Sequence, residues 1–162
     1  MKVLELSQGL KSIVDDEDYE FLSKYKWSAL RRTNGLFYAI RTRKKLEPKG
    51  SRMIYLHREI LKAKKGQFID HINNDSLDNR KQNLRFCSKK ENCRNRLITT
   101  KNTSGYKGVV WHTIAKKWIA SIKVNQKYIY LGLFIDKKQA AKAYNNAAIK
   151  YFGEFCKLNE GV

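Results

Sequence analysis

The last third of the chain alternates apolar and polar residues in a way that predicts a β-sheet covered by one helix. Such period-two alternation places one set of side chains on a core and the other set outward. In residues 117–124 the apolar set is Trp118, Ala120, Ile122 and Val124, and residues 128–131 alternate in the same way. Asp136 is a candidate helix cap, and residues at helical spacing follow it as far as Gly153: Ala140, Ala143, Tyr144, Ala147, Ala148 and Tyr151. The pattern predicts a three-stranded antiparallel sheet packed on one helix.

The first part of the chain predicts short antiparallel strands and one helix. Residues 3–14 are typical of a hairpin that turns at Gln8 and Gly9. The acidic run 15–18 favours the positive end of a short helix that continues to about residue 24. Two strand-like runs flank an Asn-Gly turn signal, namely residues 27–31 and 36–42 around Thr33, Asn34 and Gly35.

Residues 66–96 predict a strand, a loop, a second strand and a helix. Asp70 and His71 end a short apolar run, and a polar loop separates them from a strand around residues 83–86. Ser88 and Glu91 then form a Ser-x-x-Glu capping box, which is typical of a helix start. Asn92 lies just inside this helix.

These elements predict an α+β protein with four parts. They are an N-terminal mixed α/β region with antiparallel strands (1–52), a segment that carries the candidate chemistry (53–96), a polar linker (97–104) and a β-rich C-terminal domain (105–159). The first region has no function that its residues identify, and it serves either as scaffold or as additional DNA contact.

The charge points to a polyanionic partner. The chain has 34 Lys and Arg against 15 Asp and Glu, a formal charge of +19, and such an excess makes a compact protein repel itself. Basic residues are interleaved with aromatic residues along strand-like stretches, whereas a membrane-surface helix gathers them on one face. We therefore expect double-stranded DNA as the partner and no membrane. The absence of a spanning-length apolar run and of a signal-peptide pattern predicts a cytoplasmic protein.

Three cysteines, Cys87, Cys93 and Cys156, form neither a disulfide framework nor a paired C-x-x-C motif. We expect reduced thiols and no structural zinc.

The residue types around Asp70 suit phosphodiester hydrolysis. This reaction needs a water nucleophile, a base and a cation that stabilises the developing charge. A neutral His71 suits the base near pH 7, while a carboxylate and an amide oxygen are hard ligands of the kind Mg²⁺ (or Mn²⁺) prefers. Asp70, His71, Asn83 and Asn92 would meet if the helix packs across the hairpin. The nearby basic residues expected to hold phosphates are Arg80, Arg85, Arg94 and Arg96.

Five short blocks occur in order within residues 53–96: Leu56-His57-Arg58, Asp70-His71-Ile72-Asn73-Asn74-Asp75, Asp78-Asn79-Arg80, Asn83-Leu84-Arg85 and Glu91-Asn92. Together they resemble the HNH nuclease motif of phage and intron-encoded homing endonucleases. The resemblance implies a ββα-metal core and a host that is a phage-infected or bacterial cell. It also implies that His71 is the general base, that Asp70 and Asn92 bind the metal, and that Asn83 orients the His71 ring or the substrate. Asn92 stands where many relatives carry His.

A second set of blocks lies in residues 105–159: Gly105-Tyr106-Lys107-Gly108-Val109, Lys117-Trp118, Tyr130-Leu131-Gly132, Ala140-Ala141-Lys142-Ala143-Tyr144 and Lys157-Leu158-Asn159. They resemble the Apetala-type (ethylene-response-factor) DNA-binding domain of plants. The polar sheet face carries Lys117, and the resemblance adds a DNA face made of Lys107, Val110, His112, Ser121, Lys123, Tyr128 and Tyr130. Plant members often carry Arg, Glu and Arg at positions 110, 121 and 128, so their target sequence does not transfer.

The resulting hypothesis is a site-selective, homing-type DNA endonuclease that acts as a monomer or weak dimer. One centre per chain predicts cleavage of one strand per binding event. Two alternatives remain open at this point: a non-catalytic DNA-binding regulator with a vestigial nuclease, and an RNA-associated basic protein.

Overall fold

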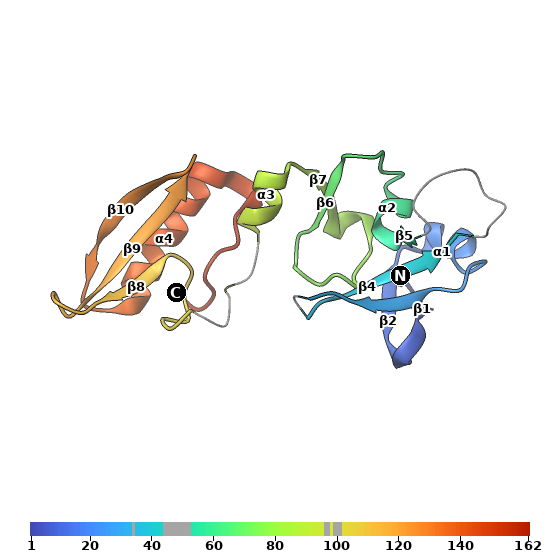
Figure 1. The fold of residues 1–162 in the computed structure, drawn as a ribbon, viewed down its shortest axis with the longest axis horizontal. Helices are drawn as coiled ribbons and strands as arrows, with labels where there is room; N and C mark the ends of the chain where they lie inside the picture. Colours follow the sequence, from blue (N-terminus) through green and yellow to red (C-terminus); the bar gives the residue numbers. More distant parts are fainter. Residues whose placement is uncertain (34, 44–52, 96–97, 99–101) are drawn as a thin grey trace. The chain divides into compact units, whose positions relative to one another are not determined.

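The structure is a computed structural model that describes residues 1–162 apart from 34, 44–52, 96–97 and 99–101 (Figure 1). Contacts between residues divide the chain into two units, Met1–Asn92 and Cys93–Val162. The regions 1–52 and 53–92, treated as separate parts from the sequence, therefore lie in one unit. Much of the expected linker, together with Arg96, falls outside the described residues.

The predicted N-terminal hairpin is confirmed. Strand β1 (Lys2–Glu5) pairs antiparallel with β2 (Lys11–Val14), and the short 3-10 turn η1 (Ser7–Gly9) joins them. Helix α1 (Asp16–Leu22) follows and has three acidic residues in its first turn, where they stabilise the positive end of the helix dipole.

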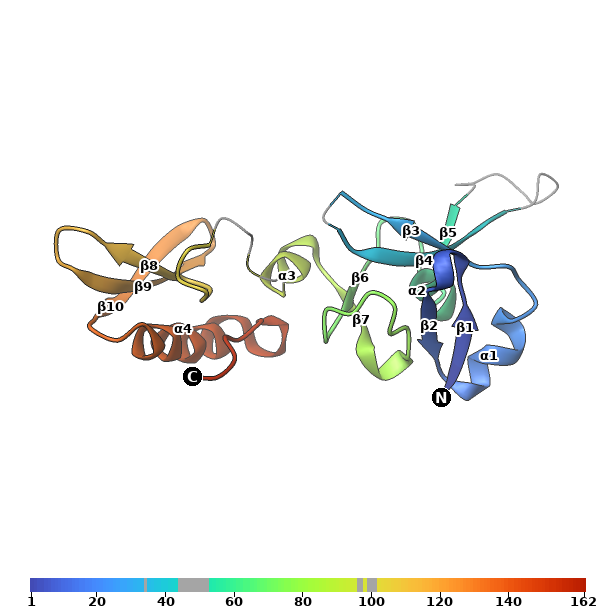
Figure 2. The same cartoon turned by 90° about the horizontal axis from the view of Figure 1, so that it is seen from below.

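A three-stranded antiparallel sheet forms the middle of the first unit. Its strands β3 (Ser28–Arg31), β4 (Phe37–Thr42) and β5 (Met53–Tyr55) lie in that order, as Figure 2 shows. Helix α2 (Leu56–Ile60) begins directly after β5, and its first three residues are the Leu56-His57-Arg58 block.

One apolar core joins these elements. Val14, Leu22 and Leu56 are at most 1% exposed and belong to the same cluster. The indole N–H of Trp27 donates to the carbonyl of Leu22 at 2.9 Å, which satisfies the polar atom of an aromatic side chain within the core. Leu84, from the candidate catalytic segment, belongs to this cluster too.

A buried ion pair links the sheet to helix α2. The guanidinium of Arg41 donates to the carboxylate of Glu59 through Nε at 3.1 Å and Nη2 at 2.8 Å. The side chains are 9% and 15% exposed. The Arg41 guanidinium also lies 4.1 Å from the ring centroid of Tyr25, so it has a charged partner and an aromatic one.

The candidate catalytic segment folds as the predicted succession of elements. Strands β6 (Phe68–His71) and β7 (Leu84–Cys87) pair antiparallel, the 3-10 turn η2 (Lys81–Asn83) precedes β7, and helix α3 (Lys89–Arg94) follows it. The predicted capping box is confirmed by two hydrogen bonds. The Ser88 N–H donates to Glu91 Oε2 at 2.7 Å, and the Glu91 N–H donates to Ser88 Oγ at 3.2 Å.

The second unit is the predicted three-stranded sheet with one helix. Strands β8 (Val109–His112), β9 (Lys117–Val124) and β10 (Lys127–Phe134) are antiparallel with β9 in the centre, and α4 (Lys137–Phe152) lies along one face (Figure 2). The short 3-10 turn η3 (Gly153–Phe155) ends the helix. The pattern of alternating burial along β9 matches the sequence prediction.

Small residues let helix α4 approach the sheet closely. The Asp136 side chain caps the helix by accepting from the Lys138 N–H at 2.7 Å. Tyr144 is 5% exposed within the core. The last turn differs from the prediction, because Tyr151 is 39% exposed and Phe152 packs against the core in its place. The apolar face of helix α4 therefore ends at Phe152, one residue later than expected.

Among the helices of the described residues, none has both the length and the apolar character needed to cross a bilayer.

Candidate functional site

Asp70 and His71 end strand β6 in a buried position. They are 6% and 7% exposed, and across the hairpin they pair with Arg85 and Leu84. Buried ionisable groups require partners, and each of these two side chains has a distinct set.

The Asp70 carboxylate is paired with Arg85. The guanidinium donates from Nε at 3.1 Å and from Nη2 at 2.8 Å, and both bonds end on Oδ2. The Arg85 side chain is 12% exposed. The sequence assigned Arg85 to a phosphate, whereas the structure places its charge on the candidate metal ligand. A phosphate bound beside Asp70 would share this guanidinium.

The His71 ring lies in an aromatic and amide environment. Its Nε2 is 3.2 Å from Oδ1 of Asn79. The rings of His57 and Tyr38 contact it edge to face, with centroid distances of 5.2 and 6.2 Å. Burial lowers the pKa of His71, while the hydrogen bond to Asn79 and the charge of Asp70 oppose that decrease. The ring is therefore neutral at physiological pH, as a general base must be.

His57 is neutral as well. Burial lowers its pKa to about 3, and the neighbouring His71 adds to the decrease. The His57 ring packs against the rings of Tyr38 and Tyr55. Tyr38 itself has a raised pKa because of burial, and the positive charge of Arg32 opposes the increase.

Asn83 organises the loop that follows His71. Its Oδ1 accepts from the backbone N–H of Asn73 at 3.0 Å, and its Nδ2 donates to the carbonyl of Asp78 at 2.7 Å. The resemblance assigned Asn83 to orienting the His71 ring or the substrate. The Asn79 amide, which belongs to the same motif, lies within hydrogen-bond distance of that ring in the structure.

Asp78 is the second buried carboxylate of this loop. It is 3% exposed, and it accepts two hydrogen bonds from the Arg80 guanidinium, at 2.7 and 2.6 Å, and one from Asn73 Nδ2 at 2.9 Å. The bond from Arg80 is the main reason why the pKa of Asp78 is lowered. Arg80, like Arg85, was expected to hold a phosphate and instead binds a carboxylate.

The proposed metal ligand Asn92 lies on α3, close to the thiol of Cys87. The Asn92 N–H donates to the Ser88 carbonyl at 3.0 Å. Burial raises the pKa of Cys87 to about 11, and the charge of Asp70 adds to the increase. The Asn92 N–H opposes it through a hydrogen bond to the sulfur. The Cys87 thiol is therefore near both Asp70 and the first turns of α3.

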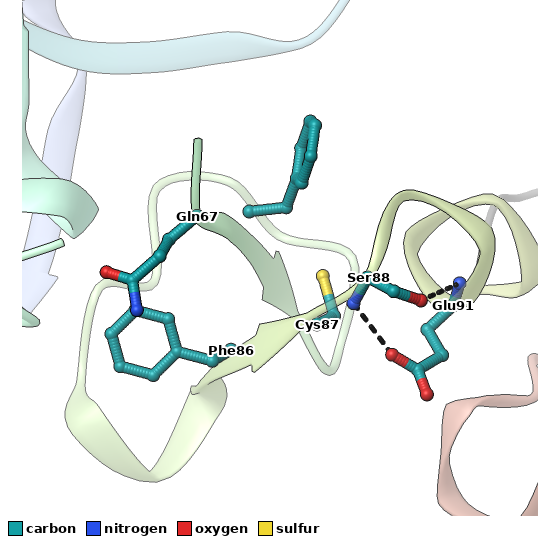
Figure 3. Close-up of a pocket in the computed structure, with 6 residues that line it drawn as sticks. Gln67, Phe86, Cys87, Ser88 and Glu91 are labelled. Atoms are coloured by element: carbon teal, nitrogen blue, oxygen red, sulfur yellow. Dashed lines mark hydrogen bonds between the residues drawn. The ribbon is translucent and has the colours of Figure 1, made fainter. Parts of the chain in front are cut away.

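A shallow hollow of about 310 Å³ opens beside this thiol (Figure 3). Figure 3 shows the two capping-box hydrogen bonds between Ser88 and Glu91 at its edge. Phe68 and Phe86, which also line it, are 44% and 46% exposed. The hollow adjoins the Asp70 face of the hairpin, because Phe68 and Cys87 are partners in the register that pairs Asp70 with Arg85.

The donor set fits a hard divalent cation that keeps most of its waters. Among the described residues, no group of three or more His, Cys, Asp and Glu side chains could hold a metal. One carboxylate and one amide are the few oxygen ligands with which proteins often bind Mg²⁺. In the site expected from the sequence, Asp70 and Asn92 would supply those two groups.

The outer face of the second unit gathers most of the expected DNA-binding residues. Pairing across the sheet places Tyr128 opposite Lys123, Tyr130 opposite Ser121, His112 opposite Lys117 and Val110 opposite Ile119. Residues directly opposite in an antiparallel sheet share a face, and α4 covers the other one. Tyr128 and Tyr130 are 74% and 61% exposed.

Lys107 and Arg94, which were also expected to contact DNA, lie away from that face. Lys107 precedes β8, and its ammonium donates to the carbonyl of Arg94. Burial lowers the pKa of Lys107. The guanidinium of Arg94 lies 4.4 Å from the ring centroid of Phe152. The expected contact at Arg96 falls outside the described residues.

Sequence reasoning missed Ser12, Tyr38 and the specific role of Asn79. The motif Asp78-Asn79-Arg80 marked the position of Asn79. Ser12 and Tyr38 come from β2 and β4, far from the motif in sequence, and neither stands in a pattern that signals a site.

Comparisons with known proteins agree with the geometry over the first unit. Residues 55–94 match the family described as HNH endonuclease. The chain is 36% identical over 63 residues to "Protein 3.8" of Escherichia phage T7, a match that covers 39% of this chain and 52% of that protein. It is 27% identical over 164 residues to "Uncharacterized HNH endonuclease L560" of Acanthamoeba polyphaga mimivirus, covering 98% of this chain and 79% of that protein. The match thus spans about half the length of the phage relative. Residues 55–94 are therefore the part of this chain that is similar to HNH endonucleases.

Proposed function

We propose that this chain is a metal-dependent DNA endonuclease of the homing type. The observation that carries the proposal is the buried pair Asp70 and His71 at the end of β6, within the segment that matches HNH endonucleases. The formal charge of +19 supports duplex DNA as the substrate.

In the proposed mechanism His71 accepts a proton from the attacking water. Burial keeps its ring neutral, which supports this role. Asp70 and Asn92 hold the Mg²⁺ (or Mn²⁺) ion, which when bound stabilises negative charge on the phosphate and the leaving oxygen. Asn83 secures the loop between the two strands through Asn73 and Asp78. The Arg85 guanidinium next to Asp70 adds positive charge where a phosphate would bind.

The second unit anchors the enzyme on DNA. Its three-stranded sheet has an exposed face with tyrosines, Lys117 and Lys123, which resembles the Apetala-type domain, and a β-ribbon of this kind can enter a major groove. With one proposed centre per chain, a monomer or weak dimer cuts one strand per binding event. We place the protein in the cytoplasm of a bacterial or phage-infected cell, where such a substrate is accessible.

The test of catalysis is nicking of supercoiled plasmid DNA with Mg²⁺. We expect His71→Ala and Asp70→Asn to lose at least about 10²-fold in rate, since each removes a proposed catalytic function. The matched control is Asp16→Asn, whose carboxylate is exposed and pairs only with the N-terminal amine in the described contacts. Equal nicking by His71→Ala and the wild type would place the activity elsewhere. Absence of nicking by the wild type, with DNA binding intact, would favour the non-catalytic regulator.

The test of anchoring is DNA binding as a function of salt. Lys123→Gln should weaken binding to duplex DNA and make the dependence on salt less steep, because one phosphate contact is lost. Lys142→Gln is the control, since this exposed lysine lies on α4, which packs on the opposite face of the sheet. Tighter binding to structured RNA than to duplex DNA in competition would support the RNA-associated alternative.

A further inference from the structure

We propose that Asn79 and Ser12 are positioning residues that fix which ring nitrogen of His71 carries the hydrogen. The proposal rests on the proposed nuclease function, because it assigns the nitrogen at which the base accepts its proton. It extends the site beyond residues 55–94 to strand β2 of the N-terminal hairpin.

The direction of the first hydrogen bond is fixed by a backbone carbonyl. Ser12 is fully buried, and its Oγ lies 2.8 Å from the carbonyl oxygen of Leu77. A carbonyl oxygen can only accept, so the Ser12 hydroxyl donates its single hydrogen to Leu77. Any other group that contacts Ser12 Oγ must then donate to it.

That requirement orients the Asn79 amide. Its Nδ2 lies 2.8 Å from Ser12 Oγ and 3.4 Å from the carbonyl oxygen of Ser76. Both neighbours require a donor, which only the NH₂ end of the amide supplies. Asn79 is 1% exposed, so turning the amide around would place its oxygen against two buried acceptors, at a cost comparable to leaving buried polar atoms unsatisfied.

The oriented amide in turn determines the state of His71. With Nδ2 directed at Ser12, the Asn79 Oδ1 faces His71 Nε2 at 3.2 Å. An amide oxygen only accepts, so Nε2 carries the hydrogen. A neutral imidazole has one N–H, and therefore the lone pair of the neutral ring resides on Nδ1. The proposal thus assigns Nδ1 as the proton acceptor.

Backbone hydrogen bonds hold Ser12 and Asn79 in place for this series of side-chain hydrogen bonds. The N–H of Ile13 donates to the carbonyl of Leu77 at 2.9 Å, and the N–H of Asn79 donates to the carbonyl of Ile13 at 2.8 Å. Ile13, the neighbour of Ser12 in β2, is therefore paired through its backbone with Leu77 and Asn79, the two residues that the Ser12 hydroxyl contacts. The edges of His57 and Tyr38 restrict the ring itself.

The experiment reads the state of His71 directly. Long-range ¹H–¹⁵N correlation spectra of the full chain, labelled in its imidazoles, distinguish the two neutral forms of a histidine at about pH 8, where an unperturbed ring is deprotonated. We expect the wild type to show the Nε2–H form. Asn79→Leu, which has no acceptor, should shift the population toward the Nδ1–H form. Asn79→Asp keeps an acceptor for His71 and should retain Nε2–H, although it should also lower stability, because its second oxygen faces Ser12 and Ser76 without a donor.

Cleavage gives the second readout. Asn79→Leu should lower kcat by about 10²-fold with little change in KM, since partners of this kind act on orientation and protonation. Ser12→Ala should lower kcat less, and Ser12→Thr, which retains the hydroxyl, should restore it. If Asn79→Leu does not fold, the Ser12 pair and Asn79→Asp still test the proposal.

A wild-type spectrum with hydrogen on Nδ1 would overturn the assignment, and so would an unchanged spectrum in Asn79→Leu. The spectra require no cleavage, so they stand even if the chain proves to have no nuclease activity. Loss of nicking in Ser12→Thr and Ser12→Ala alike would show that the hydroxyl has no specific role.

Discussion

Gly108 lies at a point of the second unit where the backbone and a buried tyrosine leave no room for a side chain. A Cβ atom there would lie 2.0 Å from Cδ2 of Tyr144 and 2.7 Å from the carbonyl oxygen of Ser121. The φ angle of Gly108 is +74°. Gly105 has a similar φ of +78°, but a Cβ atom there would meet nothing within 4 Å. A comparison of alanine substitutions at the two glycines therefore separates the cost of the left-handed backbone from the cost of steric overlap.

The expected cost of Gly108→Ala has two parts. A left-handed conformation costs a non-glycine residue about 1–2 kcal/mol, and forcing extra volume into a packed core costs about 1–3 kcal/mol. Gly105→Ala carries the first part alone. The Ser121 oxygen is backbone and Tyr144 is 5% exposed, so neither neighbour gives way easily. We expect Gly108→Ala to lose about 2 kcal/mol more than Gly105→Ala in the free energy of unfolding.

The assay is thermal unfolding combined with hydrogen exchange of the two units. For a unit of 70 residues, a difference of about 2 kcal/mol corresponds to about 8–16 °C in Tm. Exchange should accelerate in residues 105–152 and remain unchanged in residues 1–87. Gly105→Ala and Gly108→Ala proteins that unfold at the same temperature would refute the reasoning, because the overlap with Tyr144 would then carry no cost.

Three further predictions concern polar side chains. Asp78→Asn should lower stability by about 1–3 kcal/mol at pH 7, since hydrogen bonds to a charged group are lost. The pKa of Asp78 is lowered in the folded state, so the ionised carboxylate contributes to the free energy of unfolding above about pH 4, and this contribution declines as the pH falls further. Urea unfolding at several pH values should therefore show that Asp78→Asn loses less stability in acid than the wild type. Glu59→Gln should cost about 3 kcal/mol, because the buried Arg41 guanidinium loses its ion pair with the Glu59 carboxylate; urea unfolding of the first unit measures this loss. Asp136→Ala should cost the second unit about 1 kcal/mol, because the α4 cap is lost, and its Tm should fall accordingly.

Each of these has a result that would contradict it. If the stability of Asp78→Asn falls as steeply with decreasing pH as that of the wild type, the Asp78 carboxylate of the wild type is not paired in solution. Equal stability of Glu59→Gln and the wild type would mean that the ion pair between Arg41 and Glu59 does not stabilise the first unit. A fall in the Tm of the first unit in Asp136→Ala would show that the effect is not local.

Local patterns in the sequence were sufficient for most of the elements. The alternation in residues 117–124 determines which side chains face α4, because a strand has a period of two. The Ser88 and Glu91 capping box depends on residues three apart, and the structure contains both of its bonds. The Asp70-His71 pair was placed by its motif, and burial of both residues agrees with a site.

The partners of the charged and polar residues could not be predicted in the same way. Arg80 and Arg85 were assigned to phosphates because basic residues near a nuclease motif suit that role, yet each binds a buried carboxylate that had to be neutralised. The contact of Ser12 with Leu77 joins residues 65 positions apart. Such a contact depends on how β2 packs against the loop, and no spacing in the sequence reports it.

The attachment of β2 to the loop after His71 limits how residues 55–94 can be transplanted into another protein. A chimaera that received only residues 55–94 would lack the backbone partners that Ile13 gives to Leu77 and Asn79, and the loop would have to find substitutes in its new host. The smallest portable fragment therefore includes the N-terminal hairpin, and libraries that shuffle this chain with its relatives should exchange that hairpin and residues 55–94 together.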